Sequence, residues 1–240
     1  MRIKGAPPRR PGATAEADGV RFVVFAPRAT NVELCLFDDD AEMRLPMRRD
    51  GDWHEAFIAG ATAGQRYGLR ADGPWDPAAG DCFDPAKLLV DPYATRLDRA
   101  FVHAPELALP RTMAVDTARF VPKAIVEALA PLVDARPAGN PAGGLIYEIN
   151  PRAMTMRHQA IAPAQRGTLA ALAHPAIVDH VRGLGVDAIE LMPVAAWIDE
   201  RHLPPLGLAN AWGYNPVTFC ALDPRLAPGG IADLRKVVSA

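Results

Sequence analysis

The sequence has a single serine, Ser239, among its 240 residues. A Ser-His-Asp site needs a serine held against a base, so hydrolysis through a serine nucleophile is excluded. No Gly-x-x-x-x-Gly-Lys loop is present either. The segment "GLGVD" resembles half of a dinucleotide fingerprint, but it follows a helical pattern instead of opening one. The common phosphate-binding and dinucleotide-binding motifs are therefore missing.

Excess positive charge and long apolar runs are also missing. The formal net charge is -2, so no positive field would attract polyanions, and we expect neither nucleic acid nor a membrane as a partner. No apolar run is long enough to span a bilayer. The first segment, "MRIKGAPPRRPGATAEADG", is basic and rich in proline but lacks the apolar region of a signal peptide. We therefore expect a cytoplasmic protein.

Metal-ligating residues are few and widely spaced. Three cysteines form neither a disulfide framework nor a zinc motif, and we expect them to be reduced: Cys35, Cys82 and Cys220. Four histidines of the second half match no ligand spacing and are predicted at the surface: His158, His174, His180 and His202. The sequence therefore predicts no metal and no cofactor.

Alternating apolar residues dominate the first hundred positions. In "GVRFVVFAP", Val20, Phe22 and Val24 face one way, and "NVELCLFD", "DWHEAFI" and "QRYGLRA" continue the same period of two. Segments rich in turn residues separate these stretches. Short strands at such spacing predict an antiparallel β-sandwich.

Four aromatic residues of this half could stack on sugar rings: Trp53, Tyr67, Trp75 and Phe83. Trp53 and Tyr67 lie on alternating strands, and we predict that both belong to the core. Trp75 and Phe83 lie in residues 72–94, a segment rich in glycine and proline that we interpret as an ordered excursion from the sandwich. Packing between domains and ligand contact both stay open for these two, with packing favoured.

The predicted secondary structure changes after the midpoint of the chain. "VPKAIVEALAPLV" fits either a helix or a buried strand, and "DARPAGNPAGG" is typical of a linker. "GLIYEIN" and "VDAIELMPV" then predict buried strands, each followed by a helical pattern, "HPAIVDHVRGLG" and "GGIADLRKVVSA". Asp187 and Glu190 are predicted to have structural roles in the second strand. This order predicts parallel strands with helical crossovers, in an α/β layer or barrel.

Ligands of such folds gather at the carboxyl ends of the strands. The loop after the second predicted strand carries "NAWGYNP", residues 210–216, which combines two aromatic residues with Gly213. We therefore predict a ligand platform in this loop, with structural packing of the aromatic residues as the alternative.

The ordered set of motifs resembles bacterial glycogen debranching enzymes of the isoamylase type, in the α-amylase superfamily. It is carried by "GVRFVVFAPRATNVELCLFDD", "YGLRADGPWDPAAGDCFDPAKLLVDPYA", "LIYEINPRAMTMRH" and "LGVDAIELMPVAAWIDERHLPPLGLANAWGYNPVTFCALDPRLAPGG". The resemblance implies an immunoglobulin-like β-sandwich of the starch-binding type over residues 10–95, a linker over 96–144, and the first two βα units of an incomplete (β/α)8 TIM barrel over 145–240. It further implies hydrolysis of α-1,6 branch linkages in glycogen or another branched α-glucan.

The resemblance also assigns the platform. The tyrosine of the family's "GYN" lies on the active-site floor and stacks against the sugar whose bond is cleaved, and Tyr214 matches that position. Trp212 and Asn215 match supporting positions. A tyrosine that merely covers the barrel rim is the alternative.

Two departures from the family accompany this match. Near the end of strand one the family usually has His-Val and then Gly, where this chain has Asn150, Pro151 and Ala153, and the proline removes a backbone donor. The family's retaining mechanism uses two carboxylates about 5 Å apart. They come from later strands than the two matched here, so no residue of this chain receives a catalytic role, and we expect the 240-residue chain to be inactive. Two strands alone would expose apolar faces and open edges.

Three hypotheses about the function of the chain therefore remain. The chain is part of a debranching hydrolase, a non-catalytic glucan-binding remnant, or an interaction module that has lost sugar binding. Branching and trehalose-forming enzymes share the same two domains, but "GPWDP" and "FDPAKLLVDPYA" favour the debranching side.

Overall fold

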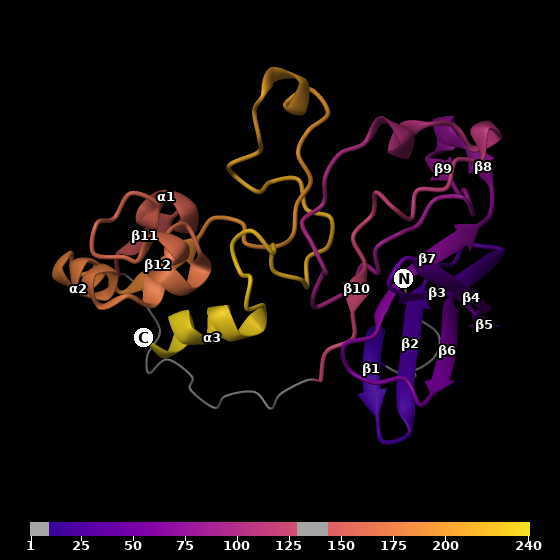
Figure 1. Ribbon diagram of the computed structural model, residues 1–240, viewed down its shortest axis with the longest axis horizontal. Helices are drawn as coiled ribbons and strands as arrows, with labels where there is room; N and C mark the ends of the chain where they lie inside the picture. The colour runs from indigo at the N-terminus through magenta and orange to yellow at the C-terminus, as the bar shows by residue number, and fades with distance from the viewer. Residues whose placement is uncertain (1–9, 129–143) are drawn as a thin grey trace. The chain divides into compact units, whose positions relative to one another are not determined.

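The computed structural model describes residues 10–128 and 144–240, and the chain divides into two compact units (Figure 1). The first unit contains Met1–Leu129 together with Val217–Ala221, and the second contains Ala130–Pro216 and Leu222–Ala240. The predicted linker at 134–144 lies outside the described residues except for its last glycine. No helix in the described part of the chain is long and apolar enough to cross a membrane.

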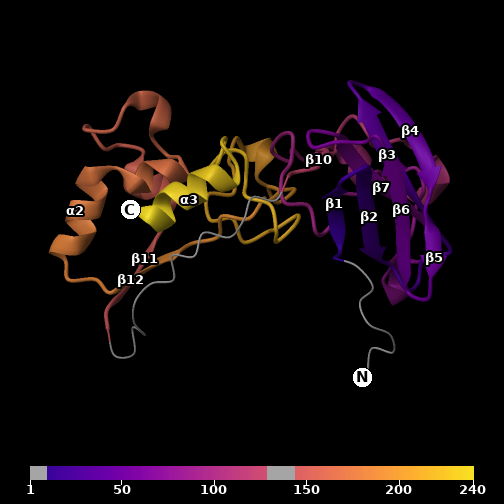
Figure 2. The same cartoon turned by 90° about the horizontal axis from the view of Figure 1, so that it is seen from below.

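The first unit is a sandwich of two four-stranded antiparallel sheets (Figure 2). One sheet has the strand order β1-β2-β6-β5 and the other has the order β10-β7-β3-β4. The strands are β1 Gly12–Glu16, β2 Gly19–Phe25, β3 Asn31–Asp38, β4 Ala41–Pro46, β5 Arg48–Asp50, β6 Trp53–Ala59, β7 Arg66–Asp72 and β10 Ala124–Ile125. The predicted sandwich is therefore confirmed, and the segment at 121–133 begins with a short strand.

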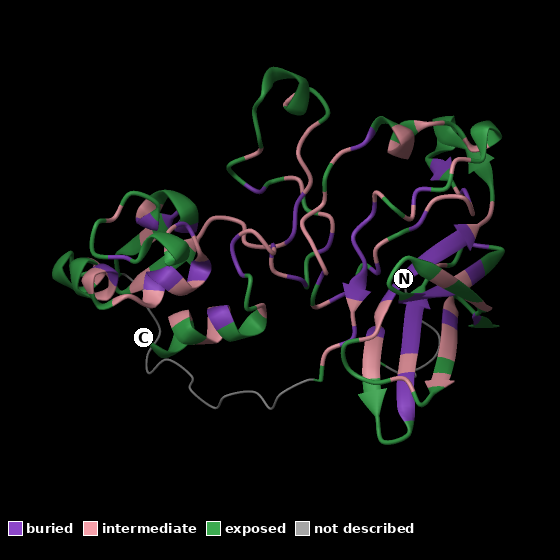
Figure 3. Cartoon of the chain, viewed as in Figure 1, coloured by how far each residue is buried: buried purple, intermediate pink, exposed green. Residues whose placement is uncertain are grey.

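The alternation in the sequence places the core between the sheets. Val20, Phe22 and Val24 are buried on β2, the most buried strand of its sheet (Figure 3). Phe22 meets Tyr67 of the opposite sheet edge to face, with ring centroids 4.9 Å apart. The Tyr67 hydroxyl donates to Asp91 at 2.8 Å, so burial of its polar end is satisfied. Burial, reinforced by the Asp91 carboxylate, raises the pKa of Tyr67 well above its usual value.

The prediction that Trp53 is a core residue is wrong. Trp53 is half-buried and packs against Phe25, with ring centroids 5.1 Å apart. The register pairs Phe25 with Trp53 and Val24 with His54, so β6 turns His54 into the core and Trp53 outward. A period of two decides which residues share a face, but it leaves open which face is buried.

A buried ion-pair network attaches the excursion after β7 to the sandwich. The fully buried Arg70 donates through Nε to Glu42 at 2.7 Å, and through Nη2 to Asp116 at 2.9 Å. Its Nη1 donates to the carbonyls of Pro85 and Ala86. Burial alone would raise the pKa of Glu42, but hydrogen bonds led by Arg70 hold it at about 2. The guanidinium is thus fully paired, as a buried charge requires.

The excursion also accounts for the two aromatic residues left open by the sequence. A Cβ at Gly73 would lie 2.8 Å from the ring of Phe83, so Phe83 packs closely inside the first unit. Trp75, on the short strand β8 (Trp75–Asp76), is 39% exposed. β8 pairs with β9, Asp81–Cys82. Phe83 is half-buried, so Trp75 is the more exposed of the two.

The second unit contains one parallel strand pair with a helix between its strands. β11 (Ile146–Ile149) pairs with β12 (Ala188–Leu191), and α2 (Pro175–Gly183) lies between them in the chain. The other α-helices among its described residues are α1, Pro151–Thr155, and α3, Ile231–Ser239, and three 3-10 helices lie at Pro163–Gln165, Leu169–Ala173 and Pro204–Leu206. A cluster of buried residues joins these elements: Ile149, Ile161, Leu169, Ala171, Leu172, Ile177 and Ala227. The predicted strand, helix, strand and helix order is present.

Burial in this unit is lower than the sequence predicts. β12 is not buried on both faces, since Ile189 is 37% exposed and Glu190 is exposed. Ile146 is 56% exposed, and Leu184, directly after α2, is 50% exposed. Asp187 does have the expected structural role, because it accepts the backbone N–H of Leu145 at 2.8 Å. The exposed apolar side chains agree with the open faces expected of a two-strand sheet.

Candidate functional site

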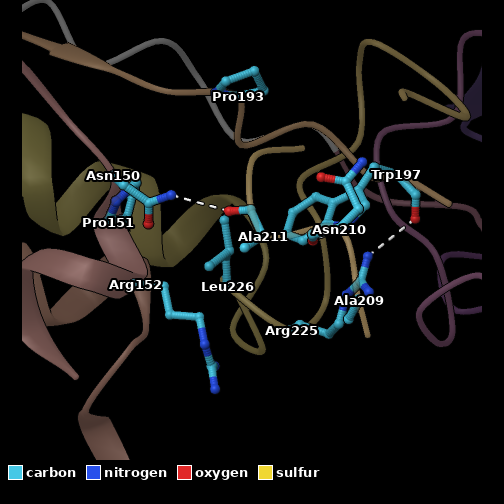
Figure 4. A pocket seen from close by; sticks show the side chains of 10 residues that line it. All are labelled: Asn150, Pro151, Arg152, Pro193, Trp197, Ala209, Asn210, Ala211, Arg225 and Leu226. Atoms are coloured by element: carbon cyan, nitrogen blue, oxygen red, sulfur yellow. Dashed lines mark hydrogen bonds between the residues drawn. The ribbon is translucent and has the colours of Figure 1, made fainter. Parts of the chain in front are cut away.

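The candidate site lies where β11 and β12 end. Asn150 directly follows β11, and Pro193 lies two residues beyond β12. Together with the loop at 209–211 they border a cavity of about 280 Å³, which we call the Asn210 cavity (Figure 4). It is lined by Asn150, Pro151, Arg152, Pro193, Trp197, Ala209, Asn210, Ala211, Arg225 and Leu226. In folds built from parallel β-strands and crossover helices, ligands bind at the carboxyl ends of the strands.

Asn210 fixes the shape of the aromatic loop. Its side-chain oxygen accepts the backbone N–H groups of Trp212 and Gly213, both at 2.9 Å. Its side-chain amide donates to Glu200 at 3.1 Å, and its backbone N–H donates to Asp199 at 2.8 Å. An asparagine side chain that accepts hydrogen bonds from the backbone N–H groups of the second and third following residues stabilises a local turn. The loop is therefore held in one conformation from within.

A stacked pair forms one wall of the Asn210 cavity. The guanidinium of Arg225 lies 4.0 Å from the ring centroid of Trp197, and Trp197 Nε1 donates to the backbone carbonyl of Asn210 at 3.1 Å. Arg225 also donates to the buried Asp223 at 2.9 Å. Asp223 in turn accepts the backbone N–H of Trp197 at 3.2 Å. This wall therefore combines the apolar ring of Trp197 with a guanidinium whose charge is balanced by Asp223.

Asn150 and Pro151, where the sequence differs from the family's usual residues, leave no backbone group without its hydrogen bond at this position. Pro151 is the first residue of α1, where its missing N–H has no partner to lose. Asn150 caps the same helix by accepting from Ala153 N at 3.0 Å, and its side-chain amide donates to the carbonyl of Ala211 at 3.0 Å (Figure 4). The side chain of Asn150 therefore ties the end of β11 to the aromatic loop.

Gly213 aims the two aromatic side chains. It has φ +80°, and a Cβ there would lie 3.0 Å from the carbonyl oxygen of Pro193, so both the backbone conformation and the available space require glycine. On either side of it, Trp212 is 67% exposed and Tyr214 is 62% exposed. Asn215 contributes its backbone carbonyl, which accepts from Ile198 N at 3.1 Å.

The predicted site residues Trp212, Tyr214 and Asn215 are therefore not among the residues that line the Asn210 cavity. Tyr214 and Trp212 stand out from the loop as exposed aromatic rings, and the Asn210 cavity is lined by other residues. Sequence reasoning missed Asn150, Trp197 and Arg225 as members of this site. Trp197 and Arg225 are 28 positions apart, so no local pattern joins them, whereas the cap-forming Asn-Pro at 150–151 was a visible signal.

The Asn210 cavity and the aromatic loop present groups that suit ligand binding. Amide groups, a paired arginine and aromatic rings suit a neutral, polyhydroxylated ligand, which combines apolar ring faces with hydroxyl groups. No group of three or more His, Cys, Asp or Glu residues that could hold a metal occurs among residues 10–128 and 144–240. The rings of His158 and His174 lie 6.5 Å apart, and His174 caps α2 through Nδ1, which accepts Ala176 N at 3.2 Å.

Known proteins share both the sequence and the fold. Residues 11–94 match the model of Carbohydrate-binding module 48 (Isoamylase N-terminal domain). A glycogen debranching enzyme of Yersinia enterocolitica is 42% identical over 235 residues, which cover 94% of this chain and 35% of the relative. One of Yersinia pseudotuberculosis is 39% identical over 239 residues, covering 96% of this chain and 36% of the relative. The chain thus spans about a third of the length of these curated relatives.

The solved structures support the fold. Pullulanase from Anoxybacillus, crystallised with maltotriose, superposes with a TM-score of 0.66 at 20% identity, over 97% of this chain and 32% of that one. At that identity the likeness concerns architecture alone. Taken with the sequence relatives, it agrees with the resemblance found in the motifs: residues 11–94 match carbohydrate-binding module 48, and the chain is similar to bacterial glycogen debranching enzymes over about a third of their length.

Proposed function

We propose that the chain is the glucan-recognising part of a glycoside hydrolase that removes α-1,6 branches from glycogen or a similar α-glucan. In this proposal residues 10–95 are the starch-binding-type sandwich, the connection over 96–144 contributes strand β10 to it, and 145–240 supply the first two βα units of a (β/α)8 barrel. The catalytic carboxylates of the retaining mechanism belong to barrel strands beyond these two. The 240 residues bind substrate and do not cleave it.

The observation that carries this proposal is the conformation of the aromatic loop at 210–215. Asn210 bonds the amides of Trp212 and Gly213, and the positive φ of Gly213 leaves Tyr214 exposed at the carboxyl side of a parallel strand pair. An ordered, solvent-facing ring costs little entropy on binding and offers a flat apolar face to a sugar. Tyr214 is therefore the proposed platform, with Trp212 and Asn215 in support.

A non-catalytic glucan-binding protein is the second candidate. It is favoured by the same loop and by the family of residues 11–94, and it differs only in lacking hydrolysis elsewhere. An assay of the protein encoded by the longest reading frame that contains this chain distinguishes the two candidates. Release of reducing ends from pullulan supports the hydrolase, and no release supports the non-catalytic binding protein.

Binding itself is tested by affinity electrophoresis of the full chain in native gels. We expect migration to be slowed by glycogen in proportion to its concentration, and unaffected by dextran, whose main linkages differ. Migration that is the same in glycogen, dextran and empty gels would overturn the proposal. Tyr214→Phe, which keeps the ring, is the matched control for Tyr214→Ala.

A further inference from the structure

The aromatic loop is attached to the chain segment that follows β12. At its base, Trp197 and Pro216 face each other in an antiparallel bridge. Within the loop, the backbone at Gly213 packs so closely on Pro193 that an added Cβ would lie 3.0 Å from the Pro193 carbonyl oxygen. Pro193 and Trp197 both follow the last residue of β12 within one short segment. These contacts hold the loop to one strand end and leave its orientation to be fixed by a second attachment.

The second attachment comes from the end of β11. In the described residues 10–128 and 144–240, one hydrogen bond joins the segment of β11 and α1 to the loop: Asn150 Nδ2 donates to the carbonyl oxygen of Ala211 at 3.0 Å (Figure 4). Ala211 directly precedes Trp212 and lies close before Tyr214 in the chain. A loop attached to two separate strand ends has less freedom to turn about either one, so this bond restrains where the two exposed rings stand.

The Asn150 side chain is itself fixed by two hydrogen bonds. Its Oδ1 accepts the backbone N–H of Ala153 at 3.0 Å, which caps α1, and this bond leaves the amide group directed at the loop. Making both bonds requires an acceptor and a donor on one short side chain, which asparagine and neutral histidine have and ionised aspartate lacks. His174 shows that an imidazole can cap a helix in this chain, since its Nδ1 accepts Ala176 N at 3.2 Å at the start of α2.

From this arrangement we infer that Asn150 is a positioning residue for the sugar platform. Its side-chain amide sets the place of residues 210–215 relative to the end of β11, and thereby the affinity of Tyr214 for a sugar ring. Asn150 acts through Ala211 and needs no contact of its own with the sugar. The inference rests on the proposed function of Tyr214, and it can fail while the Tyr214 platform stands.

The test compares the affinity of the full chain and its variants for maltotetraose by saturation-transfer NMR at about pH 8, where aspartate is ionised and histidine is neutral. Asn150→Asp keeps the cap, which a carboxylate at a helix N-terminus favours, but it cannot donate to Ala211. We expect it to bind about 2- to 10-fold more weakly with an unchanged melting temperature. Asn150→His, which can both accept and donate, should bind like the original chain. Gln159→Glu, the same amide-to-carboxylate change at an exposed residue, is the matched control and should change nothing.

The outcomes separate this inference from the proposed function. Weaker binding by Asn150→Asp beside normal binding by Asn150→His supports the positioning role, because a residue that only stabilised α1 would tolerate both changes. Equally weak binding by both variants contradicts it, since loss of the donor would then not explain the effect. Equal affinity of Asn150→Asp and the original chain, with Tyr214→Ala weakened, overturns the inference and leaves the platform.

Two further results are decisive. Unchanged affinity of Tyr214→Ala overturns the platform, and the inference with it. Should Asn150→Asp melt at a lower temperature than the original chain, Asn150→Ser replaces it, because serine caps a helix but has no amide to reach Ala211. Normal binding by the serine variant would then overturn the inference, and weaker binding would support it.

Discussion

The Arg70 network provides the sharpest test of what holds the first unit together. Glu42→Gln keeps the size of the side chain but removes the charge that Arg70 meets at 2.7 Å. The Glu42 side chain is only 13% exposed, so solvent screens the pair weakly. Its pKa falls from 4.5 to about 2, which at 1.36 kcal/mol per pKa unit corresponds to about 3 kcal/mol. Asp116 still pairs with Arg70, so we expect the variant to lose about 2 to 3 kcal/mol at neutral pH.

The sign of the pH dependence follows from the lowered pKa. The contribution of Glu42 is fully present above pH 4.5 and is lost as the pH falls towards about 2, because the unfolded chain then binds the proton more readily. Urea unfolding at pH 7 and at pH 3, followed by circular dichroism, measures both effects. Glu106→Gln, at an exposed pair with Arg119, is the control and should cost under about 1 kcal/mol. Equal stability of Glu42→Gln and the original chain at pH 7 would refute the reasoning.

Three further outcomes follow from the loop and the thiols. Asn210→Ala removes three side-chain hydrogen bonds, so amide exchange of the two loop N–H groups it holds should accelerate at least tenfold, and an unchanged rate would show that the loop is held otherwise. Gly213→Ala places a Cβ 3.0 Å from a backbone carbonyl at positive φ, so we expect a loss of about 1 to 2 kcal/mol in thermal melts, where an unchanged midpoint would contradict the strain. A thiol reagent should label the exposed Cys82 and Cys220 quickly and the buried Cys35 only on unfolding, since burial raises the pKa of its thiol; rapid reaction of all three would be inconsistent with this core.

The sequence predicted the elements of the sandwich better than their orientation. The alternation in β2 and β3 identified the core residues Val20, Phe22 and Leu34. It did not reveal that Val23, Cys35 and Phe37, on the other face of these strands, are buried as well. The same alternation in β6 could not decide between Trp53 and His54, and the larger aromatic residue is the outward one. The short strands β1, β4 and β5 have no clear apolar alternation and were missed.

Long-range partners account for the rest of what the sequence could not predict. Arg70 looks like a solvent-facing strand residue until Glu42 and Asp116, which are 28 and 46 positions away, are placed beside it. In the second unit, the apolar run at 186–194 predicted a strand buried on both faces, but Ile189 is partly exposed because β12 pairs with a single neighbour, β11, in the described sheet. The aromatic loop was found from its sequence, whereas Asn210 as its organiser required coordinates.

The most direct test of the central claim is the affinity of the chain for maltotetraose, measured by saturation-transfer NMR with Tyr214→Ala and Tyr214→Phe beside the original chain. The platform predicts transfer to the sugar-ring protons, an unchanged affinity for Tyr214→Phe, and a loss of about 1 to 2 kcal/mol for Tyr214→Ala, which is about 5- to 30-fold. Equal affinity of all three chains would mean that Tyr214 is not a sugar platform.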